Sequence, residues 1–93
     1  MSALMDAQRK AARIGELPQG RIRYYEAERP ASKLGPTRGN AYVTEWDPAT
    51  GRVRSWMKNY DHSGNVTRVH PKMINGQQVI GPHYPPTGWE LGQ

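Results

Sequence analysis

Turn-forming residues divide the middle of the chain into consecutive strands. Residues 40–47 and 52–60 alternate polar with apolar side chains and contain many aromatic and β-branched residues, a pattern typical of half-buried strands. The four residues between them end in Gly51, and the last position of such a hairpin loop favours glycine because its backbone is left-handed. A second loop, Asp61-His62-Ser63-Gly64, precedes another strand-like stretch at 65–71. This series predicts an antiparallel meander.

The segments around the meander predict one helix and further strands. Apolar residues recur at helical spacing near the N-terminus, with Ser2 as a candidate cap and Gly15 at the end of the pattern. Residues 21–27 alternate like a strand, and residues 29–40 form a long basic loop rich in Pro and Gly. A last hairpin is expected to turn at Asn75-Gly76.

These elements predict an α+β fold in a single domain over residues 1–93. The helix is expected over 1–15, a small twisted antiparallel sheet of four to five strands over 20–80, and a Pro-rich C-terminal tail over 81–93. A chain of 93 residues is too short for two independent cores, and we expect a monomer when it is free. The absence of cysteine excludes disulfides, thiolate metal sites and cysteine nucleophiles. No apolar run reaches the roughly 18–20 residues that span a bilayer, so no membrane segment is expected.

Charge points to an acidic partner. The chain has 13 Lys and Arg against 8 Asp and Glu, a formal net charge of +5. Such an excess favours association with polyanions, meaning RNA, DNA or an acidic protein. The alternative is that the cations are only solvated surface residues.

The two loops also predict which side chains share a face of the sheet. The first loop sets Glu45 opposite Arg54, and the second sets Lys58 opposite Arg68. Because side chains alternate across a sheet, one face is then the expected core, with Tyr42, Thr44, Trp46, Val53, Met57 and Val69. The expected open face carries Val43, Glu45, Arg54, Trp56, Lys58, Tyr60, Arg68, His70 and Lys72.

This open face has the side chains that metal-free RNA cleavage requires. The reaction needs a base for the 2′-hydroxyl, an acid for the leaving oxygen, and cations for the phosphorane. Glu45 and His70 suit the acid and base roles, Arg54 suits the charge, and His62 is a second acid or base at the rim. Five further residues are expected to hold phosphates or stack on bases: Lys58, Arg68, Lys72, Trp56 and Tyr60. No cofactor or metal is needed for this chemistry.

Other interpretations remain open. Glu45 and Arg54 also fit a cross-strand ion pair without catalysis. His62, Asn75 and His83 follow one another in the order seen in metal-dependent HNH nucleases, although prolines around His83 disfavour the helix that such a site uses. A non-enzymatic basic β-module that binds nucleic acid or a protein partner is the third alternative. A repeated aromatic-Asp-Gly-Val pattern is also similar to the repeats of Rhs shell proteins, but two copies are too few for a shell.

Several short motifs stand in a fixed order between residues 20 and 92. They are Gly35-Pro36-Thr37-Arg38-Gly39, Tyr42-Val43-Thr44-Glu45-Trp46, Arg54-Ser55-Trp56, Tyr60-Asp61-His62-Ser63-Gly64-Asn65-Val66, Arg68-Val69-His70-Pro71-Lys72 and His83-Tyr84-Pro85-Pro86-Thr87-Gly88. This order resembles the C-terminal toxin domains of bacterial polymorphic toxins, which cap filamentous-haemagglutinin, contact-dependent-inhibition and Rhs proteins.

The resemblance implies a function, a site and partners. Many such domains are small basic ribonucleases of the barnase and colicin type, in which a helix precedes an antiparallel sheet that cuts RNA. Glu45, Arg54 and His70 match the glutamate, arginine and histidine of the barnase branch, and Arg38 is an added RNA contact. The implied substrate is tRNA or rRNA in the cytoplasm of a target cell, reached from a secreted or surface-exposed toxin. The implied partner is an acidic immunity protein that covers the basic face.

Overall fold

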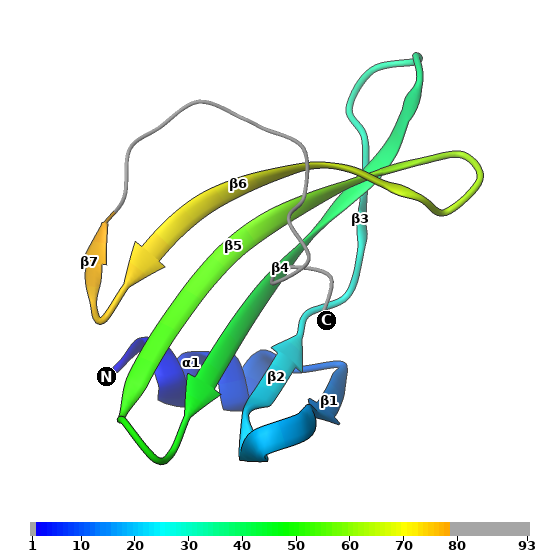
Figure 1. Cartoon of the computed structure of the whole chain (residues 1–93). Coiled ribbons are helices and arrows are strands. Elements are labelled where there is room, and N and C mark those ends of the chain that lie inside the picture. The colour runs from blue at the N-terminus through cyan, green and yellow to red at the C-terminus, as the bar shows by residue number, and fades with distance from the viewer. Residues whose placement is uncertain (1, 79–93) are drawn as a thin grey trace.

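The structure, a computed structural model, describes residues 2–78 and has an α+β fold (Figure 1). Its elements are α1 (Ala3–Lys10), β1 (Arg13–Glu16), the short 3-10 helix η1 (Pro18–Gly20), β2 (Ile22–Tyr25), β3 (Arg29–Pro30), β4 (Thr37–Asp47), β5 (Arg52–Asp61), β6 (Val66–Ile74) and β7 (Gln77–Gln78). The strands form one antiparallel sheet in the order β1-β2-β4-β5-β6-β7, and β3 pairs with β4. The predicted fold class, an N-terminal helix followed by an antiparallel sheet, is confirmed.

The N-terminal helix is shorter than the sequence pattern predicted. Ser2 caps it through its side-chain oxygen, which accepts a hydrogen bond from the backbone N–H of Met5. The backbone is already extended at Ala11, and Ala12 donates to the carbonyl of Tyr25. The segment after α1 therefore joins the sheet as β1, because pairing with β2 satisfies its backbone groups. Ile14, expected on the helix, lies on this edge strand and is largely exposed.

The sheet has seven strands where four to five were expected. The additional ones are β1 and the two-residue strand β3, while β7 is the second strand of the last predicted hairpin. Part of the predicted basic loop over 29–40 is therefore β3 and the start of β4. The hairpin predicted at Asn75-Gly76 is present as the turn between β6 and β7. The predicted tail over 81–93 lies outside the described residues.

The β4–β5 hairpin has the predicted register. Glu45 lies opposite Arg54, and Trp46 lies opposite Val53. Gly51 closes the loop with a φ of 76°, a left-handed conformation that glycine adopts without strain. The loop chemistry was therefore sufficient to fix this pairing.

The β5–β6 pairing differs from the prediction by one residue. Tyr60 lies opposite Val66 as expected, but a bulge follows, and Lys58 lies opposite Val69 where Arg68 was predicted. Thr67 is the additional residue of the bulge. This shift separates two like charges, which destabilise a sheet when they face each other. It also moves Val69, which was predicted in the core, to the face of Val43 and Trp56, where it is buried.

The core lies on the face that was predicted to be open. Val43, Trp56 and Val69 are at most 2% exposed and form its central cluster. The predicted core residues Tyr42 and Met57 lie on the opposite face, which α1 partly covers, and are only half-buried. Thr44, which was also predicted in the core, is buried on that face with Tyr24. Alternation thus sorted the side chains of β4 and β5 onto the right faces, but it did not reveal which face holds the main apolar cluster.

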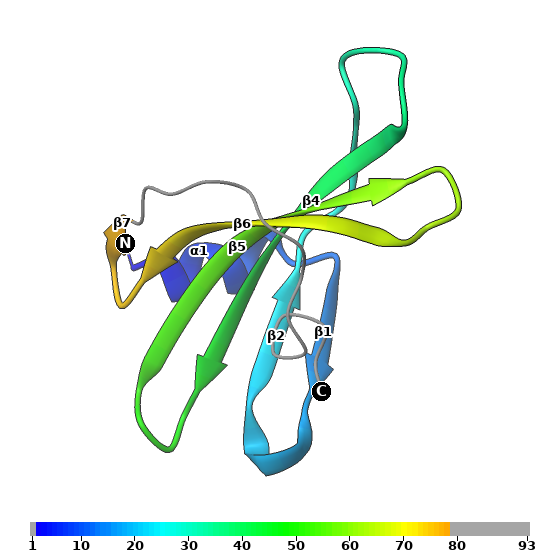
Figure 2. The same cartoon turned by 45° about the horizontal axis from the view of Figure 1, so that its top comes forward.

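One end of the sheet projects beyond the body. The β3–β4 loop and the β5–β6 loop extend from the same end of the long strands (Figure 2). Within residues 2–78, no helix has the length and apolar character needed to cross a membrane.

Candidate functional site

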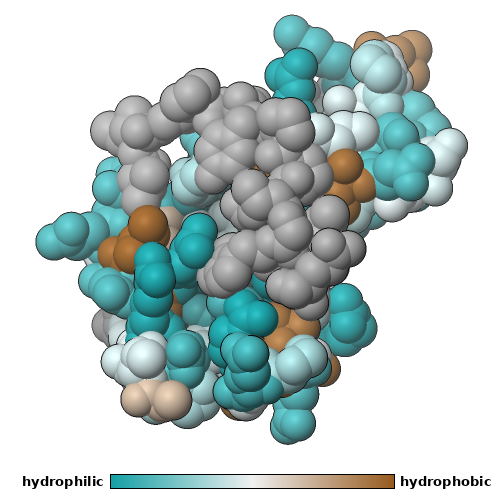
Figure 3. Space-filling view, viewed as in Figure 1, coloured by the Kyte–Doolittle hydropathy of each residue, from teal (hydrophilic) through white to brown (hydrophobic). Residues whose placement is uncertain are grey.

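A set of cations and aromatic rings lies on the face of the sheet turned away from α1. It comprises Arg13, Arg21, Arg23, Tyr25, Glu45, Arg54, Trp56, Lys58 and Tyr60, and we call it the basic face. In the view of Figure 1, α1 lies behind the strands, and the described surface on the near side is mainly hydrophilic (Figure 3). The set holds five cations and one carboxylate. The set therefore carries an excess of positive charge.

Glu45 is the centre of this set. Arg23 donates from Nε to Oε1 of Glu45 at 2.9 Å, and one terminal nitrogen of Arg21 lies 3.3 Å from the same oxygen. The side chains of Glu45 and Arg23 are only 5% and 2% exposed. Arg54 occupies the opposite position on β5. A buried carboxylate requires such partners, because an isolated buried charge is very costly.

The hydrogen bonds of this cluster are unevenly distributed. Among residues 2–78, the second oxygen of Glu45, Oε2, has one contact, at 3.4 Å to Arg21. The Nε–H of Arg21 is buried and finds no acceptor within residues 2–78. The cluster thus holds the carboxylate through one oxygen and leaves hydrogen-bonding capacity on both partners.

Cations and rings alternate along the rest of the basic face. The guanidinium carbon of Arg13 lies 3.9 Å from the ring centre of Tyr25. The ammonium of Lys58 lies 5.2 Å from the Tyr25 ring and 5.4 Å from the Tyr60 ring. Arg23 similarly approaches Trp56. These distances are within the range of cation–π attraction, so the rings help to hold neighbouring positive charges in place.

Lys58 carries the clearest electrostatic effect of this crowding. Burial lowers the pKa of Lys58, and the positive charges of Arg23 and Arg13 lower it further, while Tyr25 acts in the opposite direction. Burial also raises the pKa of Tyr60. An anion placed between these cations would reduce their repulsion.

Five predicted site residues share the basic face, as the β4–β5 register predicted: Glu45, Arg54, Trp56, Lys58 and Tyr60. Trp56 was expected to stack on a base. It is instead 2% exposed and packs with Val43 and Val69 in the core. Its ring is therefore not an open stacking surface in this structure.

Two predicted site residues lie on the other face. His70 pairs with Met57, and Arg68 pairs with Asn59, as a consequence of the bulge. The prediction that they share a face with Glu45 is wrong. Lys72 sits at a second irregularity, where the pairing of β5 and β6 shifts again. The two residues predicted to share the acid and base roles, Glu45 and His70, thus lie on opposite sides of the sheet.

The remaining predicted residues lie at the projecting end. His62 Nε2 is 2.8 Å from the backbone carbonyl of Gly35, which ties the two projecting loops together. Arg38 binds Glu28 through two hydrogen bonds of 2.9 and 2.7 Å, and this contact lowers the pKa of the Glu28 carboxyl. Arg38 also lies 5.6 Å from the Tyr60 ring, so it extends the basic face toward this end.

The arrangement of the metal alternative is not present among the described residues. His62 precedes β6 and Asn75 follows it, so the nine-residue strand separates them. His83 lies outside the described residues. Within residues 2–78 no group of three or more His, Asp or Glu is placed to hold a metal ion.

Sequence reasoning missed Arg13, Arg21, Arg23 and Tyr25 as parts of the site. The alternation of residues 21–27 predicted the strand that holds Arg23 and Tyr25, but it did not predict that this strand pairs with β4. The pairing of β2 with β4 joins residues about 20 positions apart, and no loop motif specifies it. Arg13 was placed on the helix, where it would have faced solvent.

Comparison with protein-family models, with curated proteins and with solved structures gives no match to this chain. Its function is therefore inferred from the chemistry of the site.

Proposed function

We propose that the chain is a small basic ribonuclease that cleaves RNA without a metal ion, with Glu45 as the general base. The observation that carries the proposal is the single carboxylate held among Arg21, Arg23 and Arg54 in the middle of a cation-rich face. Cleavage of a phosphate diester needs such cations, because negative charge increases on the non-bridging phosphate oxygens in the transition state.

The proposed reaction uses the 2′-hydroxyl of the substrate as nucleophile. Glu45 takes the hydroxyl proton, the 2′ oxygen bonds to the adjacent phosphorus, and the bond from phosphorus to the 5′ oxygen breaks. The products are a 2′,3′-cyclic phosphate and a 5′-hydroxyl, which receives one proton from a general acid. Arg54 and Arg21, which are less buried than Arg23, stabilise the phosphorane. DNA, which lacks the 2′-hydroxyl, cannot react by this route.

His70 is not the acid in this proposal, because it lies on the opposite face. Lys58 is the described basic-face residue that suits the role, since its lowered pKa makes its proton easier to release. His62, predicted as a second acid or base at the rim, is the other candidate from the sequence. Replacing Lys58 by Met and His62 by Ala in separate variants distinguishes the two.

The resemblance to polymorphic toxins extends the proposal to a biological role. The domain would be the effector of an interbacterial toxin, delivered into the target-cell cytoplasm to cleave tRNA or rRNA. An acidic immunity protein would then cover the basic face, because opposite charge accelerates association.

A non-enzymatic module that binds RNA is the second candidate. The burial of Glu45 in its ion pairs favours it, since a carboxylate with a purely structural role has the same surroundings. The two candidates share the basic face but differ in whether bonds are broken.

The test is incubation of the purified chain with RNA in EDTA, beside the same sequence carrying 2′-O-methyl groups. We expect cleavage of the unmodified RNA, 2′,3′-cyclic phosphate ends on the products, and no cleavage of the methylated strand. Binding of both strands without cleavage of either would reject the enzyme and favour the binding module. Cleavage only with added divalent metal would reject the metal-free mechanism.

A further inference from the structure

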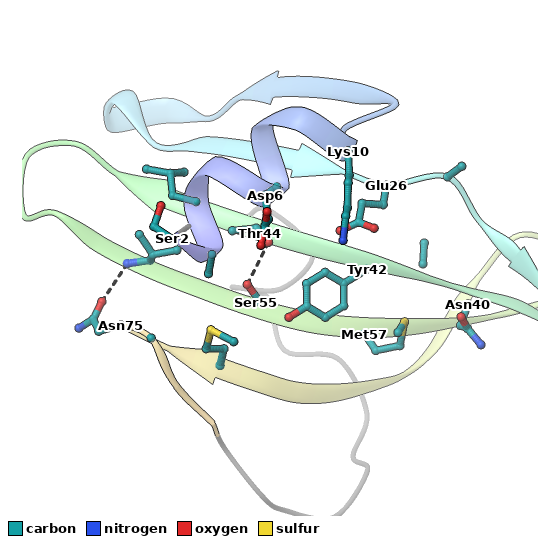
Figure 4. Close-up of a pocket in the computed structure, with 18 of the residues that line it drawn as sticks. Ser2, Asp6, Lys10, Glu26, Asn40, Tyr42, Thr44, Ser55, Met57 and Asn75 are labelled. Atoms are coloured by element: carbon teal, nitrogen blue, oxygen red, sulfur yellow. Dashed lines mark hydrogen bonds between the residues drawn. The ribbon is translucent and has the colours of Figure 1, made fainter.

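A large pocket lies between α1 and the sheet, on the face opposite the basic face (Figure 4). Its volume is about 850 Å³, within the roughly 300–1,000 Å³ of small-molecule sites. Three parts of the chain enclose it. The helix α1 forms one wall, β4 and β5 form the floor, and the end of β6 with the following turn forms the other wall.

The floor of the pocket carries hydroxyl groups. Thr44 Oγ1 and Ser55 Oγ are joined by a hydrogen bond of 2.9 Å, and both residues are buried. The Tyr42 ring stands beside them between β4 and β5, with its hydroxyl directed into the pocket (Figure 4). Hydroxyls both donate and accept, so this floor can pair with either kind of polar group on a ligand.

Thioether side chains line the pocket next to these hydroxyls. Met57 comes from β5 and Met73 from the end of β6. Methionine sulfur makes favourable contacts with aromatic rings, and its flexible chain adapts to flat shapes. This part of the pocket therefore suits a planar ring.

The charged residues that line the pocket are balanced. Asp6 and Glu26 contribute two carboxylates, and Lys10 and Arg29 contribute two cations. One oxygen of Asp6 is already paired with Arg9, which lies outside the lining, at 2.9 Å. Lys10 and Glu26 extend toward each other at one end of the pocket (Figure 4). The pocket thus differs from the chain as a whole, which has a formal charge of +5. It offers no net attraction to an anion, but its carboxylates can accept hydrogen bonds from a neutral ligand.

From this combination we propose that the pocket binds a neutral planar heterocycle with hydrogen-bonding groups, of the size of a nucleoside. The ring packs against Met57 and Met73, and polar substituents bond to Tyr42, Ser55 and the carboxylates of the walls. The site lies on the other face of the sheet from Glu45, so it is independent of the proposed RNA cleavage and is not assigned to the RNA chain being cut.

The test is an NMR titration of the full chain, labelled with ¹³C at the methionine methyl groups, with adenosine as the probe. Met57 and Met73 report on the pocket, and Met5 on the outer side of α1 is the internal control because it is not among the lining residues. We expect saturable shifts of the Met57 and Met73 methyls and none at Met5. Tyr42→Phe, which removes only the hydroxyl, is expected to weaken binding by about five- to tenfold.

A second titration, with adenosine monophosphate, tests whether the pocket prefers a neutral ligand to an anionic one. Because the pocket has no net positive charge, the monophosphate is expected to shift the two pocket methyls no more strongly than adenosine does. The proposal is overturned if about 10 mM adenosine, beyond the millimolar range of weak specific binding, shifts neither methyl. It is also overturned if Met5 shifts equally, or if Tyr42→Phe leaves the affinity unchanged while the variant stays folded by circular dichroism.

Discussion

The two faces of the sheet are built from the same strands but have different chemistry. The basic face gathers five cations around one buried carboxylate and also contains the most buried apolar cluster. The pocket face carries hydroxyls, thioethers and equal numbers of opposite charges under a short helix. The difference shows that alternation along a strand can give the two faces of a single sheet different chemistry. The apolar cluster lies on the basic face, and we propose that phosphate binds to the same face. A matched pair of substitutions tests each of these two statements.

The largest expected effect concerns which face holds the core. Trp56→Ala is expected to reduce the free energy of unfolding by about 3–5 kcal/mol, the usual cost of removing a buried aromatic ring. Trp46→Ala, on the pocket face and only half-buried, is the control and should cost under about 2 kcal/mol. Urea denaturation measures both. Equal losses would contradict the assignment of the core to the basic face.

The next effect concerns the face that is proposed to bind phosphates. The affinity for a 2′-O-methyl RNA should fall with salt, and removing one phosphate contact should reduce the slope of log K against log salt by about 0.7. Arg13→Gln on the basic face is expected to give this change. Arg68→Gln, on the other face, should leave the slope unchanged. Fluorescence anisotropy over a salt series measures both slopes. A reduced slope for Arg68→Gln but not for Arg13→Gln would contradict phosphate binding on the basic face.

The smallest expected effect is on the pH dependence of stability. Because the folded pKa of Lys58 lies below its unfolded value, the unfolded chain binds more protons in the interval between the two, and stability rises with pH there. The charged Lys58 is thus destabilising at neutral pH, and this cost disappears as pH approaches the unfolded value of about 10.5.

Lys58→Met is therefore expected to stabilise the protein at neutral pH, with a gain that shrinks toward pH 10. Lys33→Met, in the exposed β3–β4 loop, is the control and should show no such trend. Thermal unfolding at a series of pH values measures the difference. A gain from Lys58→Met that grows with pH would be opposite in sign to this explanation.

The sequence predicted the strand register correctly where a single loop sets it, and wrongly where side chains beyond the loop set it. The β4–β5 register followed from one loop that ends in Gly51. The β5–β6 register failed because the bulge at Thr67 is set by burial of Val69 and by separation of Lys58 from Arg68. Neither cause is visible in the loop itself, whose first pairs were predicted correctly.

The candidate site shows the same limit. Glu45 and Arg54 were placed together because a hairpin joins their strands. Arg23, which makes the shortest contact to Glu45, was missed because β2 reaches β4 across a long connection. His70 was assigned to the wrong face because a single-residue shift reverses the orientation of every side chain beyond it.

The most direct test of the account compares the rates of RNA cleavage by Glu45→Gln and His70→Ala, with the unmodified chain in EDTA. Both variants are checked for folding by circular dichroism, because Glu45→Gln leaves a buried arginine without its carboxylate. Chemistry on the basic face predicts that Glu45→Gln loses at least ~100-fold in rate, while His70→Ala keeps nearly full activity. If the His70→Ala variant is folded but inactive and the Glu45→Gln variant is active, chemistry on the basic face is contradicted. The reaction would then be assigned to the other face of the sheet.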